Sequence, residues 1–187
     1  MALVERVKNI LVTPKTEWPT IAEETATTQS IFVGYVVILA AIGPLAIAIR
    51  GGMIGVAAGV FSYIVALVVV FVVTLIADAL APSFGGEKNF VQSLKLVAYS
   101  HTAAWVAGIF HLLPYLGGVI SLLAGLYSLY TFYLGAPVLR KCTADKAVGY
   151  TLVVVVCVIV LWVLLGMVLM SATIGGMAGM GGMGMWR

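Results

Sequence analysis

Polar side chains that could do chemistry gather in one apolar stretch, Leu94–Pro114, which is long enough to cross a bilayer. If it spans the membrane, His101 lies near the midplane, where an ionisable group is costly and points to a functional site. No other apolar run of the chain holds so many polar groups. They are Lys95, Tyr99, Ser100, His101 and Thr102.

Two interpretations of this patch stay open. In the first, Asp78, Lys95, Tyr99 and His101 form a polar site inside the membrane that handles protons or ions, with Asp78 and Lys95 paired across a loop. In the second, His101 bonds a Ser, Thr or Tyr of a neighbouring helix and stabilises packing. Lys95, Tyr99 and Thr102 fall at i, i+4 and i+7 and share a helix face, with His101 to one side. A single histidine without a chain of acidic residues favours the second interpretation.

Methionines near the C-terminus form another candidate site. Met177, Met180, Met183 and Met185 carry soft thioether sulfurs that suit Cu(I). The alternative is a flexible glycine-rich tail, 171–187, whose methionines pack on a partner. No histidine or cysteine accompanies them, which favours the alternative, and we expect neither a metal nor a cofactor.

Sequence motifs for catalysis are absent. The chain has no His-Glu-x-x-His, no Gly-x-Ser-x-Gly and no P-loop, so we expect a protein that is not an enzyme. Cys142 and Cys157 show neither disulfide nor metal spacing and are predicted to be free thiols.

Composition places these residues in an integral membrane protein. Hydrophobic residues make up 63% of the chain and charged residues only 9%, against about a quarter in a soluble domain. The net charge of +3, without a basic run interleaved with aromatics, argues against nucleic acid as a partner. The expected partners are the lipid bilayer and either further copies of the chain or other membrane-protein subunits.

An all-α fold with five transmembrane helices is predicted to position the polar patch. Gly43-Pro44 is expected to kink the first span, because proline removes a backbone hydrogen bond. Pro114 ends the third span, so that the third and fourth form a hairpin. The predicted spans are Ile31–Ile49, Met53–Ala79, Phe90–Leu113, Val119–Leu134 and Val148–Met170.

Small residues mark the turn between the first two spans. Arg50-Gly51-Gly52 is predicted to be a tight turn. Gly51, Gly55 and Gly59 form a small-residue ridge that lets another helix approach closely.

Residues 1–30 are predicted to be a cytoplasmic segment, preceding a membrane domain of 31–170 and the tail 171–187. Trp18 is expected at the headgroup level, as tryptophans near spans often are. The alternative is a solvated tail that merely precedes the first span. Apolar residues at helical spacing favour an amphipathic helix on the membrane surface, namely Leu3, Val4, Val7, Ile10 and Leu11.

Basic residues orient the five spans. With a cytoplasmic N-terminus, eight of the ten Lys and Arg residues lie inside, and only Arg50 and Arg187 lie outside. The positive-inside rule therefore predicts a multi-pass protein of the cytoplasmic (inner) membrane, with its N-terminus cytoplasmic and its C-terminus outside.

Several segments together resemble the Yip family, five-span membrane proteins named for their interaction with Ypt/Rab GTPases. The resemblance covers about residues 1–165. It is carried by Pro14 with Glu17-Trp18, by Phe84-Gly-Gly86, by Phe90 with Leu94-Lys-Leu-Val-Ala-Tyr-Ser100, and by Trp105-Val-Ala-Gly-Ile109.

The resemblance implies a five-helix bundle with a cytoplasmic N-terminus. The short N-terminal segment and the absence of an Asp-Leu-Tyr-Gly-Pro motif make the bacterial-type members more similar, for which a Rab-type GTPase is not the expected partner. Ala103 stands where we expect proline, so the third helix is predicted to be less kinked than in relatives. We predict a membrane-organising or interaction protein, or an accessory subunit of a membrane complex. The alternative is a small transporter or channel lined by His101, Tyr99 and Asp78.

Overall fold

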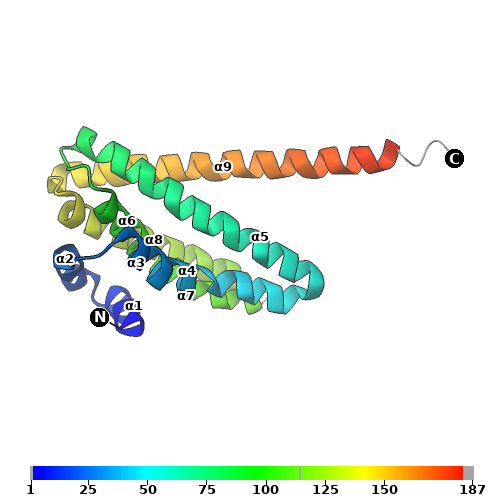
Figure 1. Cartoon of the computed structure of the whole chain (residues 1–187), viewed down its shortest axis with the longest axis horizontal. Coiled ribbons are helices and arrows are strands. Elements are labelled where there is room, and N and C mark those ends of the chain that lie inside the picture. The colour runs from blue at the N-terminus through cyan, green and yellow to red at the C-terminus, as the bar shows by residue number, and fades with distance from the viewer. Residues whose placement is uncertain (1, 114, 183–187) are drawn as a thin grey trace.

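The computed structural model describes residues 2–113 and 115–182, and the regular elements in this part are all helical (Figure 1). The α-helices α1 and α2 precede a long helical run, and a buried central segment, α8 and α9 follow it. In order, the elements are α1 (Leu3–Val12), α2 (Pro14–Glu23), α3 (Thr28–Ile31), the π-helix η1 (Phe32–Val36), α4 (Val37–Ala40), α5 (Ile42–Leu80), the 3-10 helix η2 (Ala81–Phe84), α6 (Phe90–Ser100), α7 (Thr102–Ala107), the 3-10 helix η3 (Gly108–Leu112), α8 (Leu116–Arg140) and α9 (Ala144–Gly182).

Three helical stretches in the described part are long and apolar enough to cross a membrane: Thr28–Phe84, Leu116–Arg140 and Asp145–Val168. The first is 57 residues long and contains a reversal. Gly52 has φ 56°, a left-handed value that suits glycine, and the chain turns back there (Figure 1). The predicted turn at this position is confirmed, and so is a break near Pro44, since α4 ends at Ala40.

The stretch predicted as the third span is not one continuous helix. It consists of α6, α7 and η3, with a break at His101, whose ψ of −3° leaves the α-helical range. Whether this segment is less kinked than in relatives, as the Ala103 comparison predicts, stays a prediction. Every residue from Ser93 to Ser100 is buried, so α6 is the central element on which the others pack.

The N-terminal helices pack on the bundle rather than lying free of it. Ile10 of α1 and Trp18 of α2 are 1% exposed, and Val4 stays outward. The Trp18 ring lies against Gly135 of α8, where an added Cβ would come within 2.7 Å of the indole. Trp18 is thus a core residue, and its place at the headgroup level stays a prediction.

The C-terminal helix α9 leaves the bundle and extends alone (Figure 1). Only 6% of its most apolar 18-residue segment, within Asp145–Val168, is buried against the rest of the protein. The helix continues to Gly182, past the boundary at 170 predicted between membrane domain and tail.

A glycine contact sets the distance between α5 and η3. A Cβ added at Gly108 would lie 2.8 Å from the Cα of Gly43, and that backbone has no flexible end that can move away. We expect Gly108→Ala to lower the free energy of unfolding by about 2 kcal/mol through overpacking. Thermal unfolding in detergent measures the change. Gly125→Ala is the matched control, because its Cβ would meet nothing within 4 Å; equal midpoints for the two variants would contradict the prediction.

Candidate functional site

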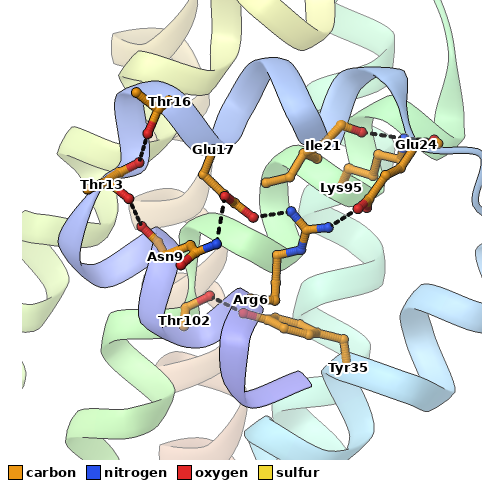
Figure 2. Close-up of polar contacts among 10 residues, drawn as sticks. All are labelled: Arg6, Asn9, Thr13, Thr16, Glu17, Ile21, Glu24, Tyr35, Lys95 and Thr102. Carbon is orange, nitrogen blue, oxygen red and sulfur yellow. Dashed lines mark hydrogen bonds and ion pairs between the residues drawn. The ribbon is translucent and has the colours of Figure 1, made fainter. Parts of the chain in front are cut away.

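A buried ion network joins α1 to α2 (Figure 2). The Arg6 side chain is 5% exposed; its Nη1 donates a hydrogen bond to the Glu17 carboxylate, and its Nη2 donates to the Glu24 carboxylate. The Asn9 amide donates to the second Glu17 oxygen at 3.0 Å. Such forked contacts fix geometry as well as charge. The two carboxylates are thereby held against the core.

Lys95 of α6 completes this network from the opposite side. Its Nζ donates to the backbone carbonyl of Ile21 at 2.7 Å and to that of Glu24 at 2.6 Å (Figure 2). These carbonyls belong to the C-terminal turn of α2, where a cation is favourable. Lys95 therefore anchors α2 to the central helix.

The predicted polar face of α6 and α7 is confirmed. Beyond Lys95, the Tyr99 ring lies edge-on to Tyr35, with centroids 4.7 Å apart, and Arg6 sits over Tyr99 at 5.5 Å. The Thr102 hydroxyl is 2.6 Å from the Tyr35 hydroxyl (Figure 2). This face contacts η1 and the N-terminal helices.

Asp78 belongs to a second ion network, and its predicted pairing with Lys95 is wrong. Its Oδ1 accepts from Arg140 Nη2 at 3.2 Å, from the Ser93 hydroxyl at 3.1 Å and from the backbone N–H of Asn89 at 2.8 Å. The reason is helix register: Ser93 and Lys95 are two residues apart and point to different sides of α6. Arg140 also donates to the backbone carbonyls of Asn89, at 2.7 Å, and Glu87.

His101 joins neither network. Its Nδ1 contacts the Val97 carbonyl of the same helix at 2.8 Å, and its ring lies 5.7 Å from Trp105. The predicted hydrogen bond to a Ser, Thr or Tyr of a neighbouring helix is not made by this residue. The imidazole instead borders a cavity of about 390 Å³ between α7, α8 and α9.

Two of the three glycines of the predicted ridge, Gly55 and Gly59, lie in a close helix contact. Cβ atoms added at Gly55 and Gly59 would lie 2.6 Å from backbone oxygens of the preceding arm, whereas Gly51 has nothing within 4 Å and takes no part in the contact.

Among the described residues, no three His, Cys, Asp or Glu side chains are grouped to hold a metal. Met177 and Met180 fall on α9 and Met183 and Met185 lie outside the described residues, so copper binding stays a prediction.

Both cysteines are free, as predicted. Cys142 is buried in the segment between α8 and α9, and this burial raises the pKa of its thiol. The thiol is therefore protonated at neutral pH and poorly nucleophilic in the folded protein.

Four further members of the site were not predicted from the sequence: Arg6, Glu17, Glu24 and Arg140. One signal was available. Arg6 falls on the apolar face of α1, at i+3 from Leu3, and a charge on such a face is expected to have a partner.

These features define a class: a helical membrane protein whose N-terminal helices are locked by ion pairs to a buried, polar central helix. The comparison with known families is in accord, because the Yip1 domain model matches residues 8–167. The chain belongs to the Yip1 domain family. Neither the curated proteins nor the solved structures contain a significant match to it.

Proposed function

We propose that this protein is a non-enzymatic member of the Yip family that organises membrane proteins, either as a scaffold or as an accessory subunit of a membrane complex. The proposal includes five membrane passes. Two are the arms of Thr28–Phe84, the third is the broken segment of α6, α7 and η3, and the last two are α8 and α9.

The arrangement of the helix ends supports a cytoplasmic N-terminus in the cell membrane. The N-terminal helices, η2 and the junction of α8 and α9 gather at one end of the bundle, and the reversal of α5 lies at the other (Figure 1). The first end includes most of the basic residues, which the positive-inside rule assigns to the cytoplasm.

The observation that carries the proposal is the separation of the three residues expected to line a transport path. Asp78 is paired with Arg140, Tyr99 faces Tyr35, and His101 borders an apolar cavity. A proton or ion path needs polar groups along one water-filled route. Three separate environments favour a structural role over transport.

The exposed face of α9 offers a surface for other subunits. Leu152, Val156 and Val163 are at least half exposed and follow one another along a helix that the bundle leaves uncovered. Association between membrane helices depends on packing of this kind of surface.

Native purification in polymer nanodiscs followed by mass spectrometry tests the proposal. We expect a stoichiometric partner or a defined homo-oligomer. A lone monomer that conducts protons in vesicles, with the flux lost in His101→Leu and kept in His111→Leu, would establish the transporter instead.

A further inference from the structure

The cavity beside His101 has a mostly apolar lining and no part in the proposed scaffold function. It measures about 390 Å³, within the range of small-molecule pockets. Val73 of α5, Phe132 of α8 and Val154 of α9 are among its apolar lining residues, and no charged side chain lines it within the described part of the chain. Its occupant must therefore be mostly apolar and uncharged.

The rim of the cavity faces lipid. Leu122 and Leu126 of α8 and Ile159 of α9 border it, and each is more than half exposed. Both helices belong to stretches that are apolar and long enough to cross the membrane. A molecule dissolved in the bilayer can thus enter sideways between α8 and α9.

Two side chains that line this apolar space, those of Ser128 and His101, each have a polar atom without a hydrogen-bond partner in the described part of the chain. The Ser128 side chain is only 8% exposed, and its hydroxyl has no hydrogen-bond partner in the described part of the chain. The Val97 carbonyl only accepts hydrogen bonds, so Nδ1 of His101 carries the proton in their contact. Nε2 of the neutral ring is then left as an acceptor.

The lining therefore carries the Ser128 hydroxyl, which can donate or accept, and the His101 Nε2, which only accepts. A buried polar group left unpaired destabilises the protein, so a complementary group is expected. A hydroxyl group both donates and accepts, whereas an ester or ketone oxygen only accepts. We propose that the cavity between α7, α8 and α9 binds a neutral lipid through its single hydroxyl group, which bridges Ser128 and His101.

Photocrosslinking of the full-length protein in phosphatidylcholine vesicles tests this site. The probe is a diacylglycerol with a diazirine in one acyl chain, and the matched probe is the same molecule with its hydroxyl acetylated. We expect the hydroxyl probe to label α8 and α9 about five to ten times more than the acetylated one, the ratio that one to two hydrogen bonds give.

Three variants distinguish binding at a specific site from unspecific contact with lipid. His101→Phe should remove the preference for the hydroxyl probe while leaving labelling by the acetylated probe unchanged, because only the free hydroxyl can donate to Nε2. Ser128→Ala should lower labelling by the hydroxyl probe. Gly125→Phe should abolish labelling by filling the cavity, since a Cβ at Gly125 meets open space. Gly118→Phe is the control, because Gly118 also has open space but does not line the cavity.

Equal labelling by both probes in the wild-type protein would overturn the proposal, because a bridging water or unselective lipid would then account for the two polar groups. Labelling that survives Gly125→Phe would overturn it too. Thermal midpoints of all variants show whether a lost signal reflects unfolding, and in that case labelling is repeated below the lowered midpoint. None of these outcomes depends on whether the protein acts as a scaffold.

Discussion

Replacing Arg140 by methionine is expected to lower the free energy of unfolding by about 3–5 kcal/mol, because the Asp78 carboxylate then stays buried without its counter-charge. The Arg140 side chain is 0% exposed and that of Asp78 is 8% exposed, so water replaces little of what is lost. The carbonyls of Glu87 and Asn89 lose a donor as well.

A thiol-reactive dye that labels Cys142 on thermal unfolding in detergent measures this loss in a Cys157→Ala background, since the buried Cys142 thiol reacts only when the structure opens. Glu87→Gln is the matched control. It removes the exposed ion pair with Lys141 but keeps the carbonyl that accepts from Arg140, and its midpoint should barely change. A drop in Arg140→Met no larger than in Glu87→Gln would refute the role given to the buried pair.

The second large effect is expected from Arg6→Met, which should release the N-terminal helices while the membrane bundle stays folded. The variant leaves the Glu17 carboxylate, whose side chain is 7% exposed, buried without its cation, whereas the Glu24 side chain is 35% exposed and stays in contact with water. A penalty of about 3 kcal/mol on the docked state follows from the loss of one partner of a buried ion pair.

Limited trypsin digestion at Lys15, an exposed residue of α2, reports on this release. Because cleavage needs local opening, we expect it to be more than about tenfold faster in Arg6→Met than in the wild-type protein. Lys8→Met, on the exposed side of the same helix, should be cleaved at the wild-type rate. If both variants are cleaved equally fast, Arg6 does not hold the N-terminal helices.

Hydropathy and backbone chemistry predicted much of the fold. The break before Pro44 and the reversal at Gly52 follow from the properties of proline and glycine alone, and these act locally. The shared face of Lys95, Tyr99 and Thr102 follows from helical periodicity. The contact partners of these three side chains could not be predicted from helical periodicity.

The ion networks escaped prediction because their members are distant in sequence. Arg140 and Asp78 are 62 residues apart, and several cations could have paired with each carboxylate. Only packing decides among them, as with Ser93 rather than Lys95 beside Asp78. The break at His101 was also missed, since no proline or glycine stands there to signal it.

The anchoring of α2 by Lys95 has a consequence for biosynthesis. Glu24 leaves the ribosome about 70 residues before Lys95 does, a delay of roughly 4–14 s at ordinary rates of translation. During this interval the N-terminal helices have no surface on which to dock, and their charges stay hydrated. Docking of the N-terminal helices can therefore follow only after the segment that carries Lys95 has been made.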